Sequence, residues 1–375
     1  MDSRSHRPCV TFLTTMPSPY TLDLFQALHV NGDIDLHALF MEMTAPDLPW
    51  GSVALPQYAS LLRGSWCNVG GGRVHCNPGV LGALTATKPD VVVVSGYSSL
   101  TTQLVMRWLK WRRMPWIFWG ELPGMRKLGA VRHRMRSFAR YPAIAWPSAI
   151  AAIGRVAQRE YRTLAYPGCV VKNLPYYTDL EPFLTQPRST SPDEVRVLYC
   201  GQLIERKGVL SLLDSFLALA YEIPRLTLQL VGDGPLREQL ERKVPAALKP
   251  RVQFTGFQPV HALPKYFSSA DIFVLPSRHD GWGVVVNQAL GAGLPLICSD
   301  QVGAAHDLIT EGSNGDIVPV DNTELLIQSL RQLALNPDKC QEYGAKSRAI
   351  ALKWTPACGA ERWVRLINSV VIKTK

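Results

Sequence analysis

Short apolar runs alternate with segments of helical periodicity along this chain, and no other feature limits its fold as strongly. The four consecutive valines at 91–94 are typical of a strand that is buried on both faces. A segment of helical period at 100–113 follows, and another apolar run stands at 116–119. The order strand, helix, strand predicts a parallel sheet with right-handed crossover connections.

The alternation stops once and then starts again. Residues 173–195 are rich in Pro, Ser, Thr and acidic side chains, which is typical of a linker. Beyond them, 197–200 is a predicted strand and 207–219 a predicted helix. A length of 375 residues also suits two domains better than one core. We therefore predict an α/β protein with two doubly wound parallel-sheet, Rossmann-like domains that face a cleft: an N-terminal domain at 1–175, a linker at 176–195 and a C-terminal domain at 196–355.

Ligands of open α/β sheets bind at the carboxyl ends of the strands, so the loops that follow the predicted strands are candidate binding sites. In the loop 201–208, Gly201 allows the close approach of an anion, and Arg206 and Lys207 place two positive charges at a helix start. A second loop contains Gly232 in a tight strand-to-helix turn. Taken singly, each loop is explained at least as well by an ordinary helix start or turn.

A third loop carries Gly281 and Gly283 on either side of Trp282, immediately before a predicted helix. Backbone N–H groups in this arrangement form a nest suited to a pyrophosphate. Asp280 can accept hydrogen bonds from sugar hydroxyls, and Gln288 in the helix can hydrogen-bond another polyol such as a ribose. An N-cap Asp and a neutral Gln on the helix face are the alternative. The three loops in this order form a much stronger pattern than any one of them.

The order and spacing of these loops make the C-terminal half similar to the nucleotide-sugar-binding half of family 4 glycosyltransferases (glycosyl transferases group 1). The similarity rests on the segments GQLIERKG, LQLVGDGPLREQL, VQFTGF and ADIFVLPSRHDGWGVVVNQALGAGLPLI. The N-terminal half resembles the family more loosely, through PSPYTLDLFQAL and FWGE. The resemblance implies a GT-B fold, a retaining glycosyltransferase of the hexosyltransferase class, and a helix at 356–372 that packs back on the N-terminal domain.

The resemblance also implies where a nucleotide-sugar donor binds. Gln202 and Lys207 fall in the family's phosphate-binding loop, and Asp280 and Gln288 take the places of its paired glutamates, which contact the transferred sugar and the ribose. The family's phosphate-binding Arg is replaced by Gln202, and Arg206 can supply the missing charge. The expected donor-binding residues are Gly201, Gln202, Arg206, Lys207, Gly232, Gly281, Trp282, Gly283, Val284 and Gln288. The expected catalytic residues are Asp280 and Glu121.

Positive charge is concentrated in the N-terminal half. Residues 1–185 carry 19 Lys and Arg against 11 Asp and Glu, and 101–140 alone carries ten basic residues against one acid, Glu121. Glu121 follows a predicted strand, and we expect it to bind the acceptor or to stabilise charge near the transferred sugar. A salt bridge to one of its basic neighbours explains it equally well.

Four of the ten tryptophans also fall within 101–140: Trp108, Trp111, Trp116 and Trp119. Basic and aromatic residues together are typical of surfaces that bind nucleic acid or an anionic membrane. Since no nucleic-acid-binding motif accompanies them, we expect a glycan or lipid-linked acceptor at an anionic membrane surface, and no nucleic acid. Ordinary helix charges with tryptophans in the core are the alternative.

The cysteines and histidines form no recognisable ligand set. The eight cysteines contain no C-x-x-C pair, and His75 and the other scattered histidines form no constellation. We therefore expect no metal site and a metal-independent reaction that needs only a UDP- or GDP-sugar donor. The cysteines suit reduced thiols, and the first residues lack the pattern of a signal peptide. The sequence also contains no apolar stretch of about 20 residues that could span a bilayer. We therefore expect a cytoplasmic protein, peripheral on the inner face of the plasma membrane.

The expected function is the transfer of a sugar to a glycan or lipid-linked acceptor, in surface polysaccharide or lipopolysaccharide biosynthesis. Two alternatives stay open. One is a nucleotide-sugar epimerase of the same architecture. The other, prompted by Gln202 and Gln288, is a non-catalytic nucleotide-sugar binding protein.

Overall fold

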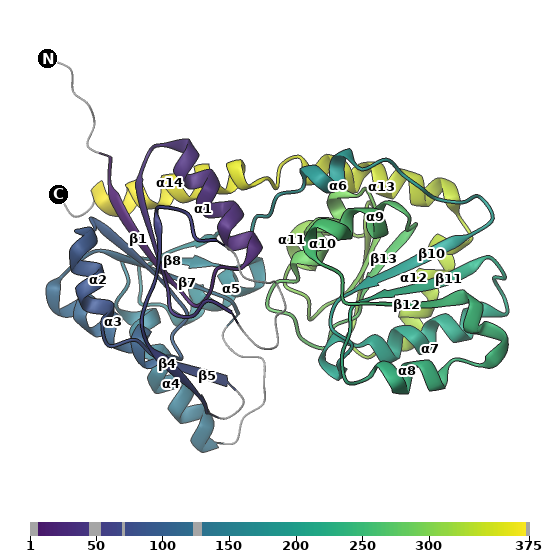
Figure 1. The fold of residues 1–375 in the computed structure, drawn as a ribbon, viewed down its shortest axis with the longest axis horizontal. Coiled ribbons are helices and arrows are strands. Elements are labelled where there is room, and N and C mark those ends of the chain that lie inside the picture. Colours follow the sequence, from purple (N-terminus) through teal and green to yellow (C-terminus); the bar gives the residue numbers. More distant parts are fainter. Residues whose placement is uncertain (1–6, 45–53, 70–71, 123–129, 373–375) are drawn as a thin grey trace, which may run out of the picture. The chain divides into compact units, whose positions relative to one another are not determined.

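The computed structural model describes residues 7–44, 54–69, 72–122 and 130–372 (Figure 1). The chain divides into two compact units, of which unit 1 consists of Met1–Thr178 and Pro356–Lys375 and unit 2 of Asp179–Thr355. Each unit is a Rossmann-like α/β layer structure with a parallel sheet, as the alternation of apolar and helical segments predicts.

Unit 1 contains a seven-stranded sheet in which all neighbouring strands are parallel. In spatial order its strands are β3 (Ala59–Leu61), β2 (Asp35–Phe40), β1 (Cys9–Thr14), β6 (Val91–Ser95), β7 (Trp116–Gly120), β8 (Ala149–Ala152) and β9 (Val170–Asn173). The four valines of β6 are fully buried, which confirms the prediction of a strand covered on both faces.

The helices of unit 1 and a separate hairpin surround this sheet. The helices are α1 (Pro19–Asn31), α2 (Val80–Thr87), α3 (Leu100–Arg112), α4 (Ala130–Ala145), α5 (Arg155–Leu164) and α14 (Pro356–Ile372). The hairpin pairs β4 (Ser65–Val69) with β5 (Gly72–Cys76) in antiparallel register. Every connection between neighbours in the large sheet is therefore a crossover, and the carboxyl ends of its strands share one edge.

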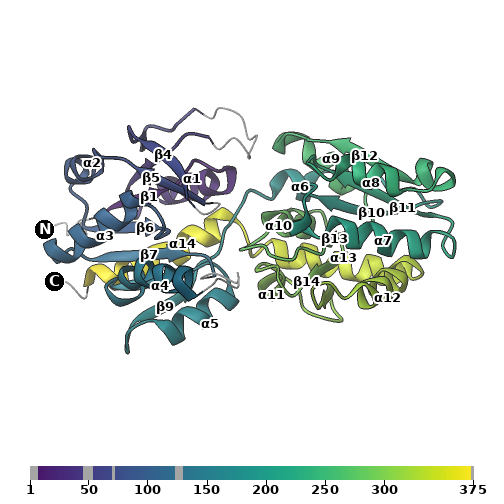
Figure 2. The same ribbon diagram turned by 90° about the horizontal axis from the view of Figure 1, so that it is seen from below.

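Helix α14 belongs to unit 1 although all of unit 2 precedes it in the sequence (Figure 2). It packs against α1 and β6. Its Trp363 is fully buried, with ring centroids 5.2 Å from Phe12 and 5.3 Å from Trp119, both edge-on. Edge-to-face aromatic packing of this kind adds to the burial of a large apolar side chain, so Trp363 anchors the C-terminal helix.

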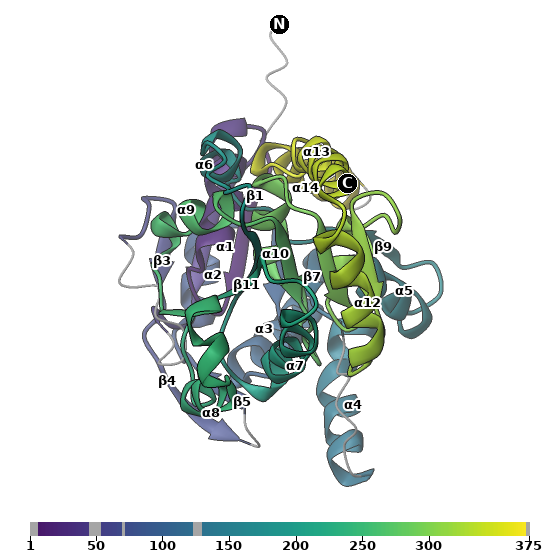
Figure 3. The same ribbon diagram turned by 90° about the vertical axis from the view of Figure 1, so that its right-hand side faces the viewer.

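Unit 2 contains a six-stranded parallel sheet, with β10 between β11 and β13 in its middle. In spatial order the strands are β12 (Val252–Gly256), β11 (Leu226–Val231), β10 (Val195–Cys200), β13 (Ile272–Leu275), β14 (Leu296–Ser299) and β15 (Gly315–Val318). The α-helices are α6 (Glu181–Thr185), α7 (Val209–Ala220), α8 (Arg237–Lys243), α9 (Leu263–Ser268), α10 (Val284–Gly291), α11 (Ala305–Leu308), α12 (Thr323–Ala334) and α13 (Pro337–Ala351), and the 3-10 helices are η1 (Glu205–Lys207), η2 (Ala246–Arg251) and η3 (Val260–Ala262). Figure 3 shows α7 beside α12, which pack against each other.

The segment 176–195 differs from the expected linker. It contains α6, and its residues from Asp179 onward belong to unit 2. Phe183 is buried, and its ring meets that of Phe267 edge-on with centroids 5.3 Å apart. The segment is therefore part of unit 2 from Asp179 onward and is anchored there by the buried ring of Phe183. Within the described parts of the chain, every helix is too short or too polar to cross a lipid bilayer.

Candidate functional site

The three loops expected to bind a ligand meet at the carboxyl edge of the sheet in unit 2. They follow β10, β11 and β13, which are adjacent strands. Backbone hydrogen bonds join them: the N–H of Leu203 donates to the carbonyl of Asp233 over 2.9 Å, and the N–H of Arg278 donates to that of Arg206 over 2.8 Å. The loops therefore form one connected surface, although they are far apart in sequence.

An ion pair links two of these loops. The Nζ of Lys207 lies 2.5 Å from Oδ2 of Asp280, and both side chains are largely buried, at 14% and 13% exposed. Partial burial makes this pair stronger than a pair on the open surface, because water screens it less. The structure thus brings together the two residues that were expected to contact the phosphates and the transferred sugar.

Arg206 lies beside this pair and has a positioning contact of its own. Its Nη1 donates to the backbone carbonyl of His279 over 2.8 Å, so the guanidinium ties the first loop to the third. A guanidinium carries five N–H donors, and this bond uses one of them. The side chain can therefore hold the loops together and still present positive charge.

Two glycines of the site are required by packing. Gly208 has φ of +68°, and a Cβ there would overlap the backbone carbonyl of Pro276. Gly232 has φ of +136°, and a Cβ there would overlap the carbonyl of Gly201. These glycines let the three loops approach one another, which is a structural reason for their presence beside the expected contact with phosphate.

Trp282 contributes to the third loop differently from its neighbours. Its side chain is buried, its Nε1 donates to Oδ1 of Asn287 over 2.9 Å, and its ring lies 6.0 Å from that of Trp354. Only the backbone of Trp282 can therefore contact a ligand. Asn287, which the sequence patterns did not single out, fixes the indole and so the shape of the loop.

Helix α10 begins directly after this loop, with Gly283 as its N-cap residue and Val284 as its first residue. The first N–H groups of a helix have no acceptor within the helix, and the helix dipole adds partial positive charge. Gln288 lies on α10 and is 6% exposed, and its Oε1 has no hydrogen-bond partner among the residues that the structure describes. A buried amide oxygen of this kind needs a donor, which a ligand hydroxyl can supply.

Tyr199 in β10 supports the first loop through its buried hydroxyl. Burial, then the nearby Cys200 and Asp280, raise the pKa of its hydroxyl well above the usual value, so the group stays protonated. It donates to the backbone carbonyl of Gln202 over 2.7 Å. Burial also raises the pKa of Cys200 to about 12, so this thiol is not a nucleophile at neutral pH.

At the carboxyl edge of unit 1, Glu121 follows β7, as expected. Its Oε1 accepts a hydrogen bond of 3.1 Å from the hydroxyl of Tyr176, and its backbone carbonyl accepts one of 2.8 Å from Tyr161. Burial, followed by the charge of Glu121, raises the pKa of Tyr176 well above its ordinary value. The tyrosine therefore remains a donor and orients the carboxylate.

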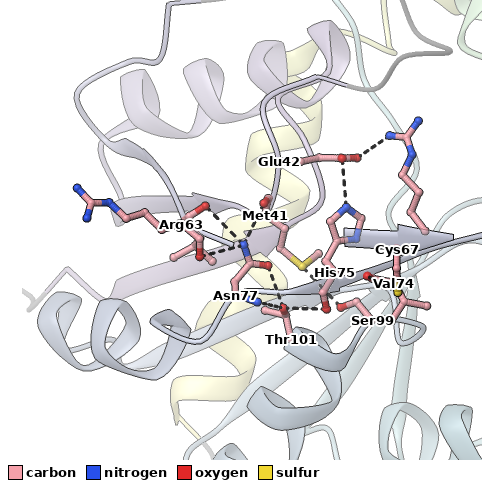
Figure 4. Close-up of polar contacts among 11 residues, drawn as sticks. Met41, Glu42, Arg63, Cys67, Val74, His75, Asn77, Ser99 and Thr101 are labelled. Atoms are coloured by element: carbon pink, nitrogen blue, oxygen red, sulfur yellow. Dashed lines mark hydrogen bonds and ion pairs between the residues drawn. The ribbon is translucent and has the colours of Figure 1, made fainter. Parts of the chain in front are cut away.

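A second polar cluster at this edge was not predicted from the sequence (Figure 4). Glu42 follows β2 and is buried, with Oε1 3.0 Å from Nη1 of Arg73 and Oε2 3.3 Å from Nε2 of His75. Nearby, Nδ2 of Asn77 donates to the carbonyl of Met41 over 3.0 Å. The expectation that His75 belongs to no constellation is therefore wrong, because the hairpin β4–β5 folds back onto the end of β2.

One group in the described residues has the spacing of a metal site. The side chains of Cys9, Asp35 and His37 place one potential ligand atom each within 4.8 Å of the others. They lie near the amino ends of β1 and β2, the sheet edge opposite to Glu42 and Glu121. The pairing of β1 with β2 places Cys9 beside Asp35, and the spacing of these residues in the sequence does not show that contact.

The basic window 101–140 divides between core and surface. Trp116 and Trp119 lie in β7 and are buried, so their part of the aromatic pattern belongs to the core. Trp111 on α3 is 75% exposed. On α4, Met135, Phe138 and Tyr141 are all more than half exposed among basic residues. Residues 123–129 of the window lie outside the described residues.

Comparison with solved structures agrees with the fold. Solved structures with the same fold include sucrose-phosphate synthase from Thermosynechococcus elongatus, with a TM-score of 0.75 and 17% identity over 98% of this chain and 100% of that one. Anabaena Alr3699/HepE in complex with UDP has a TM-score of 0.71 and 16% identity over 96% of this chain and 100% of that one. The fold class is therefore GT-B, as expected.

A family model matches part of the C-terminal half of the sequence. Residues 183–350, which all lie in unit 2, match the family model described as Glycosyl transferases group 1. Alpha-D-kanosaminyltransferase of Streptomyces kanamyceticus is 31% identical over 39% of this chain and 38% of its own length. The lipopolysaccharide core biosynthesis glycosyltransferase LpsD of Rhizobium meliloti is 34% identical over 40% of this chain and 41% of its own. The chain thus spans less than half the length of these relatives, whose names, like the family, indicate a glycosyltransferase.

Proposed function

We propose that this chain is a retaining glycosyltransferase that moves a sugar from a UDP- or GDP-sugar to a glycan or lipid-linked acceptor. One observation carries the proposal. At the carboxyl edge of unit 2, the Lys207–Asp280 pair lies in the same loop cluster as the N-terminus of α10, whose Gln288 has a buried oxygen without a partner in the described structure. A cation, a sugar-binding carboxylate and a polyol-binding amide are what a nucleotide sugar requires.

Donor binding follows from these groups. The diphosphate binds the ammonium of Lys207 and the N–H groups at the start of α10, where a helix N-terminus favours anions. Asp280 then accepts hydrogen bonds from hydroxyls of the sugar, and Gln288 accepts one from the ribose. An unsatisfied buried oxygen costs about 1–3 kcal/mol, and the ribose hydroxyl removes that cost on binding.

In the proposed reaction, the bond between the sugar C1 and the phosphate oxygen breaks, and C1 bonds to the acceptor oxygen on the same face. The acceptor proton passes to the departing phosphate, so the reaction needs no protein nucleophile. Lys207, with the charge of Arg206 beside it, stabilises the negative charge that develops on the diphosphate. The chain's own contribution is thus electrostatic and positional.

The acceptor side of the proposal rests on unit 1. Glu121 at the carboxyl edge is an oriented carboxylate that can bind an acceptor hydroxyl. Helix α4 presents exposed Met135, Phe138 and Tyr141 next to Arg134 and Arg136, which suits attachment to an anionic bilayer. We propose a lipid-linked or glycan acceptor at the cytoplasmic face of the plasma membrane, in the synthesis of a surface polysaccharide. The lipopolysaccharide enzyme among the relatives supports this assignment.

A donor screen tests the proposed function. Thermal shift and slow donor hydrolysis are measured with UDP-, GDP-, ADP- and dTDP-sugars, and NMR reports the anomeric configuration of the product. We expect one nucleotide class to stabilise the protein, and its sugar to be released with retained configuration. Binding without hydrolysis or transfer favours the non-catalytic alternative, an epimerised nucleotide sugar favours the epimerase, and no shift with any donor contradicts the proposal.

Sedimentation with liposomes tests the membrane assignment separately. We expect the protein to sediment with vesicles that contain phosphatidylglycerol and to stay in solution with neutral phosphatidylcholine vesicles. The double variant Phe138→Ser/Tyr141→Ser on α4 should reduce the bound fraction, whereas Trp66→Ser, an exposed aromatic on β4, should not. Equal sedimentation with both lipids contradicts the assignment.

A further inference from the structure

A cavity of about 750 Å³ opens on unit 2 away from the loops described above. It lies at the amino edge of the sheet, where Val195 begins β10 and Asp271 precedes β13. Its other walls are the segment 188–194, one face of α13, and the C-terminal ends of α10 and α12. Lys207 and Asp280 are at the opposite, carboxyl edge, so this cavity is separate from the proposed donor site.

Three arginines line the cavity: Arg188, Arg225 and Arg348. Two of them are fixed by backbone carbonyls, since Arg225 donates to Ala334 over 3.0 Å and Arg348 donates to Leu184. The guanidiniums of Arg225, which directly precedes β11, and of Arg348 on α13 are therefore held in place beside the same cavity. Positioned guanidiniums of this kind recognise phosphate and carboxylate groups.

The acidic residues of the cavity offset little of this charge. Glu194 already accepts hydrogen bonds from Arg196, at 2.6 and 3.2 Å, and from Thr227 at 2.5 Å. Asp271 accepts a bond of 2.8 Å from the backbone N–H of Arg196, and its other oxygen lies 3.7 Å from Arg188. Glu194 is thus paired outside the cavity lining, with Arg196, and Asp271 forms one long ion pair with Arg188. The three arginines of the lining therefore leave an excess of positive charge in the cavity.

Burial and repulsion act in the same direction on Arg188. Partial burial lowers the pKa of its guanidinium, and the charge of Arg348 lowers it further, against the opposite effect of Asp271. The negative charge of a bound anion would offset both the cost of desolvation and the repulsion between the two arginines. Part of the wall is apolar, with Ala292, Leu333 and Ala334 buried in it.

We propose that this cavity is a second ligand site, which binds a small organic anion with an apolar body and a dianionic head, of the phosphate monoester class. The volume falls in the range of sites for small molecules and is far larger than an inorganic ion requires. The three arginines bind the head, and the alanine and leucine wall contacts the body. The site does not depend on the donor loops and stands whether or not the chain transfers sugars.

Phenyl phosphate is a suitable probe, and its binding to the full-length chain can be followed by ligand-observed saturation-transfer NMR. We expect saturable binding that phenol, which lacks the charge, does not reproduce, and that inorganic phosphate reproduces only weakly. Arg188→Gln/Arg348→Gln should weaken binding at least about tenfold, because two charge-assisted contacts are lost. The matched control is Arg242→Gln, an exposed arginine of α8 in the same unit, and it should bind as the unmodified chain does.

Two further variants keep the proposal falsifiable. Ala345→Phe on α13 fills the cavity without changing charge and should abolish phenyl phosphate binding if the site is correctly placed. Lys207→Gln removes the cation of the donor loops and should leave the binding unchanged. Undiminished binding in the arginine double variant or in Ala345→Phe, loss in Lys207→Gln, or an equal loss in Arg242→Gln would overturn the proposal.

Discussion

The two units share one architecture and differ in how their polar residues are held. In unit 2, three strand-end loops are joined by backbone hydrogen bonds, such as that from Leu203 to Asp233, and by an ion pair from Lys207 to Asp280. In unit 1, Glu42 and His75 meet only because a hairpin folds back on the sheet. The family match lies entirely in unit 2. A site built from strand-end motifs is thus visible in sequence, whereas one built from an inserted hairpin is not.

The largest effect on stability is expected from helix α14, the C-terminal helix that completes the core of unit 1. Replacing Trp363 by Ala removes a fully buried ring that contacts Phe12 and Trp119, and should lower the free energy of unfolding of unit 1 by about 3–5 kcal/mol. Trp111→Ala, at a position 75% exposed, is the matched control and should change it by less than about 0.5 kcal/mol. Urea denaturation followed by circular dichroism and fluorescence measures both. An equal loss of stability in the two variants would show that α14 does not complete the core of unit 1.

The next effect concerns the loops of unit 2. Lys207→Gln removes the cation proposed to face the diphosphate and should lower kcat for donor hydrolysis by about 100- to 1000-fold, measured at a temperature where the variant stays folded. Lys243→Gln is the matched control, since Lys243 also forms a 2.5 Å ion pair, with Asp214, but on the exposed surface. Similar turnover in both variants would remove Lys207 from the proposed mechanism.

A smaller effect is expected from the cluster in unit 1. Glu42→Gln leaves Arg73 and His75 without a carboxylate in a largely buried place, and should destabilise unit 1 by about 1–3 kcal/mol. Asp35→Asn breaks an exposed pair of the same type, in which the Asp35 and His37 atoms are 3.7 Å apart, and should have little effect. Denaturant unfolding at neutral pH compares the two. If both variants unfold alike, the cluster is not a structural link between hairpin and sheet.

The success of sequence reasoning differed between fold and site for physical reasons. Parallel sheets bury both faces, so an uninterrupted run such as 91–94 identifies a strand directly, and the GT-B fold followed from the alternation together with the resemblance. Loop residues at strand ends, such as Lys207 and Asp280, were found because topology alone brings the ends of adjacent strands together. These predictions needed no knowledge of side-chain orientation.

The residues that were missed or misjudged depend on contacts that spacing does not record. His75 gains its partner through the hairpin, and Cys9 meets His37 through strand register. Trp282 lies in a predicted binding motif, yet its ring points into the core, because Asn287 and Trp354 fix it there. Side-chain direction within a loop is decided by tertiary packing, so a motif locates the loop and leaves the orientation of each residue open.

The smallest effect is expected from Glu121→Gln, and it distinguishes the proposed role of unit 1 in turnover from that of unit 2 in donor binding. Glu121→Gln preserves the shape of the side chain and a hydrogen bond from Tyr176 but removes the charge, and should lower turnover by about tenfold while donor-induced thermal stabilisation stays the same. Lys207→Gln should instead reduce that stabilisation, because the proposed donor site lies in unit 2. Turnover that is unchanged in folded Glu121→Gln protein would mean that the carboxylate only helps to hold the end of β7. Reduced turnover with intact donor binding would place the acceptor function at this edge of unit 1, outside the residues 183–350 that match the family model.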